Sequence, residues 1–162
     1  MPPQIVSLRS AADGDLDAIN RIIDACIMTW DLPDRVKRLS LSSYRYSRID
    51  LDFLDIVIAV NPEGEILGVA AWEQAETGDT PDGASGLLLH GIYVAPPQQH
   101  RGIGARLFCA ALEAVRQHGL TGLLVKAQAD ANGFFTALGM QPVAHDGDPR
   151  LYANRFWMRV ES

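Results

Sequence analysis

The sequence has 162 residues, of which 14 are Lys or Arg and 20 are Asp or Glu, so its formal net charge is −6. A chain of this length can bury a core without disulfides or a structural metal, and a single α/β domain over residues 1–162 is expected. Because the chain is acidic and has no basic run, neither nucleic acid nor an anionic membrane is expected as a partner.

The two cysteines, Cys26 and Cys109, form no C-x-x-C motif and no Cys/His ligand spacing. Neither a disulfide framework nor a zinc site is therefore expected. The segment Met1–Arg9 lacks a basic stretch followed by an apolar run, and no apolar run approaches a membrane span, so a soluble, cytoplasmic protein is expected. The sequence is compatible with a homodimer.

Spacing of apolar residues predicts the elements of the N-terminal half. Asp13 can cap a helix whose apolar positions lie three or four apart as far as Trp30, and Pro33 suits the first turn of a second, less regular helix. That second helix is expected to give way to a polar segment ending at Arg48. The predicted strands are Ile5–Leu8, Ile56–Val60 and Ile66–Trp72, the last two forming a hairpin around Asn61–Gly64.

The C-terminal half alternates strand and helix patterns. The predicted strands are Leu87–Val94, Leu123–Ala127, Met140–Ala144 and Arg155–Val160, and the predicted helices are Ile103–His118, which Gly119 can terminate, and Ala131–Leu138. A turn is expected at His145–Arg150. The run Leu87–Val94 is apolar enough for a central strand.

The junction between Val94 and the helix starting at Ile103 is the most informative segment. A strand that feeds into a helix N-terminus aims unpaired N–H groups at one spot, and this favours an anion. Gly102 and Gly104 would let a phosphate approach the backbone, and Arg101 and Arg106 would add local positive charge. The alternative is that the glycines only let the turn pack close to the sheet.

Spacing excludes one familiar phosphate-binding motif and argues against another. The chain contains no Gly-Lys-Ser or Gly-Lys-Thr, which a P-loop requires. A dinucleotide fingerprint needs a Gly or Ala three residues after Gly104, where this chain has Leu107.

Gln99, Gly102 and Gly104 fit a different pattern, which resembles the Q/R-x-x-G-x-G/A signature of the GNAT superfamily of acyl-CoA-dependent N-acetyltransferases. The stretch Ile92–Pro96 is similar to the strand end that precedes this signature, and Gly133–Met140 resembles the family's FYxxLGF segment. The order of predicted elements also resembles the family. The resemblance implies an α/β fold with a central, mostly antiparallel sheet and helices on both faces.

The same resemblance implies acetyl-CoA as cosubstrate and no metal. The backbone of Ile92, Tyr93 and Val94 would bind the pantetheine arm and the acyl carbonyl. Amides of one continuous segment would bind the pyrophosphate, namely those of Gln99, His100, Arg101, Gly102, Ile103, Gly104 and Ala105.

The sequence departs from the family pattern at three positions. His100 stands where glycine is frequent, and Gln128 stands where an asparagine often contacts the cofactor, with Asn132 four residues later as an alternative. Phe135 stands where many members carry the tyrosine that protonates the departing thiolate. That role is then vacant or is taken by another group, such as Tyr44, Tyr46, Tyr152 or water.

His90 is the candidate general base. Strand alternation puts its side chain on the face of Ile92 and Val94 unless a bulge intervenes, and Tyr93 would point to the opposite, core side. The alternative is that His90 is a packed structural histidine.

Structural roles are expected for Cys109 and for two aspartates near the C-terminus. Cys109 is expected to be inert core. Asp146 and Asp148 would suit a cationic substrate but are typical of turns.

The function expected from these residues is acetyl transfer from acetyl-CoA to a small-molecule or peptide amine, by direct attack in a ternary complex. The alternatives are a CoA-binding module without catalysis and an acyltransferase that uses another acyl chain or a hydroxyl acceptor.

Overall fold

The computed structural model describes residues 5–126, 132–143 and 155–160. Its strands are β1 (Ser7–Ser10), β2 (Asp55–Val60), β3 (Ile66–Gln74), β4 (Gly86–Val94), β5 (Gly122–Lys126), β6 (Gln141–Pro142) and β7 (Arg155–Arg159). Its α-helices are α1 (Leu16–Ile27), α2 (Asp34–Tyr44), α3 (Arg48–Phe53), α4 (Ile103–Gln117) and α5 (Asn132–Ala137). Three short 3-10 turns are η1 (Asp13–Asp15), η2 (Pro81–Gly83) and η3 (Pro96–Gln98).

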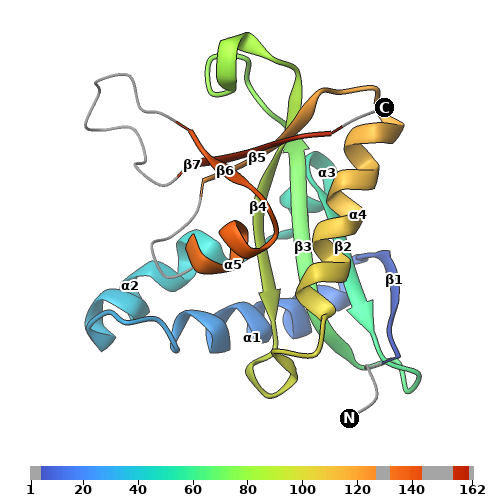
Figure 1. The fold of residues 1–162 in the computed structure, drawn as a ribbon. Helices are drawn as coiled ribbons and strands as arrows, with labels where there is room; N and C mark the ends of the chain where they lie inside the picture. Colours follow the sequence, from blue (N-terminus) through green and yellow to red (C-terminus); the bar gives the residue numbers. More distant parts are fainter. Residues whose placement is uncertain (1–4, 127–131, 144–154, 161–162) are drawn as a thin grey trace. The chain divides into compact units, whose positions relative to one another are not determined.

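The strands form one seven-stranded sheet in the order β1-β2-β3-β4-β5-β7-β6 (Figure 1). Strand β1 pairs antiparallel with β2, and β7 pairs antiparallel with both β5 and β6. The pair β4–β5 is parallel, so the sheet is mixed. The predicted α/β class with a mostly antiparallel sheet is confirmed.

Most predicted elements are present with shifted ends, and one helix was not predicted. Strand β1 begins at Ser7 instead of Ile5, and the predicted polar segment before Arg48 is followed by α3. The N–H of Ser47 donates to the carboxylate of Asp50 at 2.7 Å, which caps this helix. Helix α3 was missed because none of its residues is buried, and periodicity detects only a buried face. The predicted turn at His145–Arg150 lies outside the described residues.

Contacts divide the chain into two compact units. One comprises Met1–Ala71 and Ile92–Phe108, and the other comprises Trp72–Gly91 and Cys109–Ser162. The expectation of a single domain stays a prediction.

The core of the first unit is built on the apolar stripe of α1. Ile19, Ile23 and Ile27 are fully buried, and they belong to one cluster with residues of β2 and β3 such as Ile58 and Val69. The neighbouring residue on β3, Gly68, points to the other face. A Cβ atom there would lie 3.2 Å from the side chains of Ile103 and Leu107, so the first turns of α4 pack closely on β3 at this glycine.

In the second unit, one tryptophan lies against a pair of glycines. Gly86 of β4 is directly opposite Gly122 of β5, and the indole of Trp157 in β7 covers both. A Cβ atom on Gly86 would lie 2.9 Å from the ring, and one on Gly122 would lie 2.4 Å from it. The absence of side chains at both positions is therefore what admits the indole, and it fixes how β7 lies beside the parallel pair.

We predict that Gly122→Ala lowers the free energy of unfolding by about 1–3 kcal/mol or more, because its methyl group would overlap Trp157 and the Met158 carbonyl oxygen, 2.6 Å away. Gly78→Ala is the matched control, since a Cβ atom there has no neighbour within 4 Å. It should change stability by less than about 0.5 kcal/mol. Urea unfolding of both variants checks this. Equal stabilities would mean that the indole does not lie on the glycine pair.

Candidate functional site

The segment between β4 and α4 is a tight turn. The Ala95 N–H donates to the Leu67 carbonyl at 2.9 Å, and the Gln98 N–H donates back to the Ala95 carbonyl at 2.7 Å, which closes η3. Helix α4 then begins, and the Arg106 N–H makes the bond that joins it to the Gly102 carbonyl, at 3.1 Å. The predicted strand, glycine turn and helix are thus present.

The first amides of α4 form a cluster of donors. Within the described ranges of the chain, the N–H groups of Gly102, Ile103, Gly104 and Ala105 have no backbone acceptor. A Cβ atom at Gly102 would have nothing within 4 Å, so the space next to this backbone is open. The helix dipole places about half a positive charge at this end. The geometry suits a phosphate group, as the sequence predicts.

His100 adopts a backbone conformation that glycine adopts more easily. Its φ is 65°, and that of Gly102 is 85°, both in the left-handed region. For a residue with a Cβ atom this conformation costs about 1–2 kcal/mol. The family's frequent glycine at the position of His100 therefore has a physical reason, and this chain holds the same turn at some cost.

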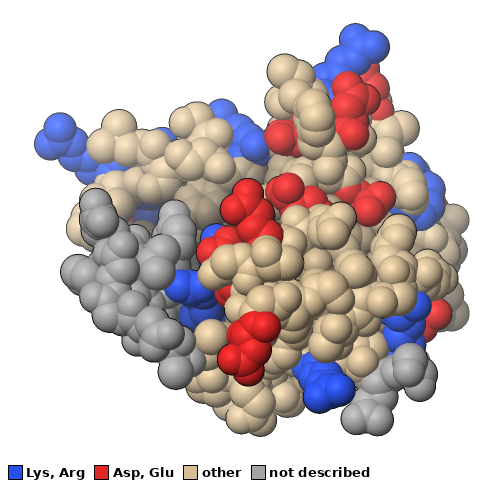
Figure 2. Space-filling view, turned by 90° about the horizontal axis from the view of Figure 1, so that it is seen from above, with Lys and Arg blue, Asp and Glu red and all other residues tan. Residues whose placement is uncertain are grey.

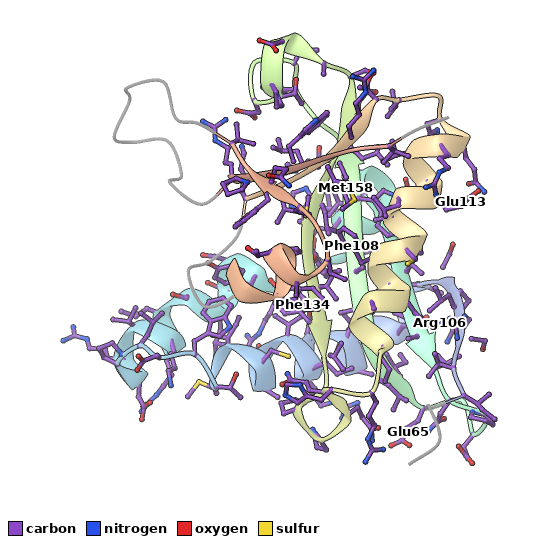
Figure 3. All side chains as sticks on the ribbon, viewed as in Figure 1. Glu65, Arg106, Phe108, Glu113, Phe134 and Met158 are labelled. Atoms are coloured by element: carbon purple, nitrogen blue, oxygen red, sulfur yellow. The ribbon has the colours of Figure 1, made fainter. Side chains whose placement is uncertain are left out.

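The two arginines of this segment are already engaged. The guanidinium of Arg106 donates to the Val6 carbonyl, and that of Arg101 donates to the Gln98 side chain at 3.4 Å. Figure 3 shows Arg106 and the buried Phe108 leaving α4 on different sides. Arg106 therefore anchors the segment before β1, and the expectation that it adds charge to the turn is not supported by its contacts.

Strand β4 contains a bulge. The Gly86 carbonyl accepts at 2.8 Å from the N–H of Ala75, the residue after β3, and the N–H of Ala95, the residue after β4, donates to Leu67 of β3, so both ends of β4 lie beside β3. Gly86 and Ala95 are an odd number of residues apart, and strict alternation would turn them to opposite edges. One residue between them must therefore be extra.

The side chains locate the bulge between His90 and Tyr93. His90 contacts Glu73, which lies on the same face of β3 as Ala71, and Ala71 and Tyr93 belong to the same core cluster. His90 thus shares a face with Tyr93 and not with Ile92 and Val94, contrary to simple alternation. The prediction that Tyr93 is core is confirmed.

After the bulge, the backbone groups of Ile92 and Val94 point away from β3. Ala95 is bonded to β3, so alternation turns Val94, and Ile92 before it, to the other edge. The pairing of β4 with β5 covers only Gly86–Leu89 in the part of the chain that is described. This edge is where the sequence predicts the pantetheine arm.

The Val94 carbonyl accepts two hydrogen bonds. The Gln99 side chain donates through Nε2 at 3.1 Å, and the thiol of Cys26 in α1 donates through Sγ, also at 3.1 Å. Gln99 was predicted to bind the pyrophosphate through its backbone amide. In the structure this N–H donates to the Pro96 carbonyl at 3.3 Å, and the side chain binds the Val94 carbonyl. Cys26 was not predicted as a site residue.

His90 bonds through Nε2 to a carboxylate oxygen of Glu73. The two side chains are 34% and 41% exposed, so His90 is not packed under a helix. Glu73 was not predicted as a site residue because the predicted strand ended at Trp72, one residue earlier. Had the predicted strand Ile66–Trp72 been extended by one residue, the carboxylate of Glu73 would have been placed beside the apolar strand Leu87–Val94, which contains His90.

Two phenols and one thiol are in environments that disfavour their ionised forms. Burial raises the pKa of the Tyr46 and Tyr93 phenols well above the ordinary range, and the other phenols and Cys26 add to the shift at Tyr93. Burial likewise raises the pKa of the Cys26 thiol to about 11. Groups with raised pKa values are weak acids, and a protonated thiol is a poor nucleophile.

Cys109 is exposed, so the prediction that it belongs to the core is wrong. It directly follows the buried Phe108 on α4, and adjacent helical residues point about 100° apart, which turns the thiol to solvent. Tyr44 makes an edge contact with the indole of Trp30, with ring centroids 5.2 Å apart, as expected for a packing role.

Phe135 is 4% exposed and packs against Phe134 and Phe156, with ring centroids 5.2 and 6.1 Å away. Asn132 is the first residue of α5. The remaining candidates, Gln128, Asp146, Asp148 and Tyr152, lie outside the described residues.

On the face shown in Figure 2, Lys and Arg side chains are scattered and do not gather into one patch. Within the described ranges, no group of His, Cys, Asp and Glu side chains is arranged to hold a metal ion, and no helix is long and apolar enough to cross a membrane.

Several solved structures share this fold. The PaiA N-acetyltransferase of Thermoplasma acidophilum, in complex with coenzyme A, matches with a TM-score of 0.74 at 12% identity over 98% of this chain and 100% of that one. A GNAT acetyltransferase of Brucella melitensis with acetyl-CoA gives 0.64 at 16% identity over 98% and 90%. AtaT complexed with acetyl-methionyl-tRNAfMet gives 0.61 at 18% identity over 96% and 95%.

No curated protein matches the chain. The model of the acetyltransferase (GNAT) family matches residues 25–140, which is most of the sequence and includes β4, the glycine turn and α4. Together with the fold, this match means that the chain belongs to the GNAT family of acetyltransferases.

Proposed function

We propose that the protein transfers the acetyl group of acetyl-CoA to a primary amine, with both substrates bound together and no covalent intermediate on the enzyme. The observation that supports this best is the run of amides at the N-terminus of α4, which directly follows the edge of β4 formed by Ile92 and Val94. One segment thus offers donors for a pyrophosphate and a strand edge for an extended arm. PaiA and the Brucella protein, which share the fold, bind CoA and acetyl-CoA.

The amides of Gly102 to Ala105 would hold the pyrophosphate, helped by the dipole of α4. The backbone edge at Ile92 and Val94 would hold the pantetheine arm. The Val94 N–H is then the donor placed to stabilise negative charge on the acetyl carbonyl oxygen during attack. A preorganised donor of this kind lowers the barrier because it does not need to reorient as charge develops.

His90 would take the proton of the attacking amine. A lysine-like amine has a pKa near 10.4, so only about one molecule in a thousand is neutral at pH 7, and a base must collect the proton. The amine nitrogen forms the amide bond while the carbon–sulfur bond breaks, and the electron pair leaves on sulfur. His90 lies just before the bulge on the same strand as Val94, and is partly open to solvent, to which it can pass the proton.

The departing thiolate makes small demands on the protein. Its pKa is near that of cysteine, about 8.5, so it leaves without strong help from an acid. This fits a chain in which Phe135 has no hydroxyl and in which burial weakens the Tyr46 and Tyr93 phenols as acids. Solvent can protonate the thiolate after it leaves.

The acceptor proposed is a small-molecule or peptide amine. The net charge of −6 suits a cationic amine better than a nucleic acid. AtaT, which shares the fold, is complexed with an acetylated aminoacyl-tRNA, so an aminoacyl-tRNA belongs among the acceptors to be tested.

We predict that acetyl-CoA raises the melting temperature and that Gly104→Glu abolishes this shift, because the added carboxylate would occupy the anion site. At a concentration a hundredfold above the dissociation constant, the ligand should stabilise the protein by about 2.7 kcal/mol. Gly78→Glu, at an exposed glycine with open space around it, is the charge-matched control and should keep the shift. A normal shift in folded Gly104→Glu would place the pyrophosphate elsewhere.

We predict turnover with at least one member of a panel of amino acids, polyamines, peptide N-termini and an aminoacyl-tRNA, measured as CoA thiol release. With the best acceptor, His90→Gln should lower kcat/KM about a hundredfold to ten-thousandfold, while the acetyl-CoA melting shift is retained. His118→Gln, an exposed histidine at the end of α4, is the control. Full activity of His90→Gln would exclude it as the base, and the absence of any turnover would contradict the proposed function.

We predict that Cys109→Ala retains turnover within several-fold of the unsubstituted protein. The thiol is exposed and could be acetylated, but direct transfer does not use it. Peptide mass spectra of protein mixed with acetyl-CoA and stopped during turnover should contain no acetylated Cys109. Its kinetically competent acetylation would replace direct transfer with a two-step mechanism.

A further inference from the structure

The carbonyl of Val94 differs from the other backbone groups at the end of β4 because two side chains bind it. A backbone carbonyl has two lone pairs, and so accepts two good hydrogen bonds. At Val94 one comes from Nε2 of Gln99 and the other from Sγ of Cys26, each at 3.1 Å. Both acceptor positions are therefore filled by the protein itself.

The two donors come from different elements. Gln99 follows η3 in the turn that leads to α4, and Cys26 lies in the last turn of α1, where it is 6% exposed within the core cluster. The peptide unit that contains this carbonyl is held from its other end as well, since the Ala95 N–H donates to Leu67 at 2.9 Å. Three segments thus fix the orientation of one peptide plane.

This orientation matters for the neighbouring N–H group. Rotation of the Val94–Ala95 peptide changes ψ of Val94 and disturbs the extended backbone that points the Val94 N–H away from β3. A carbonyl with a free lone pair would also compete for the N–H groups of the pantetheine arm. With the carbonyl filled, Val94 offers only its N–H, and the carbonyl of Ile92, which alternation turns to the same edge, is left to accept from the arm.

We propose that Cys26 and Gln99 are positioning residues for acetyl transfer. They occupy both acceptor positions of the Val94 carbonyl and thereby orient the Val94 N–H as the donor to the acetyl oxygen. This inference rests on the proposed function. It assigns a role at the acetyl end of the site to Gln99, the first residue of the family signature, and a role to Cys26 of α1.

The chemistry of Cys26 is suited to this task. Burial raises the pKa of its thiol to about 11, so the S–H remains a donor throughout the physiological range. The group does not need to react, and it takes no proton from a substrate.

The test is a double-mutant cycle with Cys26→Ala and Gln99→Met, each of which removes one donor while roughly keeping shape. Each single variant should lower kcat three- to tenfold with less than twofold change in the KM for acetyl-CoA. The double variant should lose more than the product of the two, because only then is the carbonyl without any donor. Cys26→Ser, which keeps a donor, should retain more than half of the rate.

A second measurement is independent of turnover. The carbonyl-carbon chemical shift of Val94 reports the hydrogen bonds that it accepts, and it should move in both single variants and move furthest in the double variant. Unchanged shifts in folded variants would overturn the inference. So would a rate unaffected by the double substitution, or a Cys26→Ser protein as slow as Cys26→Ala, since packing and not hydrogen bonding would then explain the loss.

The proposed function can fail separately. If the unsubstituted protein acetylates no amine, the acetyl-transfer proposal fails whatever the shifts show. If it turns over and the variants behave like it, only the role of Cys26 and Gln99 is rejected.

Discussion

A strand offers its N–H and C=O groups to alternate edges, and β4 breaks this order once between His90 and Tyr93. Before the break, β4 pairs with both of its neighbours. After it, the backbone groups of Ile92 and Val94 face an edge with no strand partner among the described residues. The proposed arm site, the oxyanion donor and the proposed positioning residues all depend on this one extra residue. Without it, Val94 would point its backbone groups into the β3–β4 ladder.

The turn that follows β4 extends the same arrangement. Gln98 and Ala95 close η3, Gly102 begins the hydrogen bonding of α4, and the amides after it are left open to a ligand. Contacts with residues far away in sequence hold this segment in place. Arg106 reaches the carbonyl of Val6, and Gly68 lets α4 lie against β3. The site is therefore built mainly from backbone groups, whose positions are set by packing around them.

Much of the fold and the glycine turn could be predicted because their signals are local. Apolar periodicity marks α1 and α4, and the spacing of Gln99, Gly102 and Gly104 marks the turn. The bulge could not be predicted, because one extra residue leaves the apolar character of Leu87–Val94 unchanged. The contacts of Glu73 with His90 and of Cys26 with Val94 join distant segments. The first would have required the predicted strand to run one residue further, and nothing near Cys26 in sequence reveals the second. Cys109 was wrongly predicted to be buried because it directly follows the buried Phe108, and a rotation of about 100° between adjacent helical residues turns its side chain to solvent.

The left-handed backbone of His100 has a consequence for the energetics of binding. Folding holds this residue in a conformation that costs about 1–2 kcal/mol before any ligand is present. A loop that is already ordered loses little conformational entropy when an anion arrives, whereas a looser loop would lose more at that step. The protein therefore gives up a little folding free energy at one turn, and an anion bound at the proposed site would meet a surface that hardly needs to rearrange.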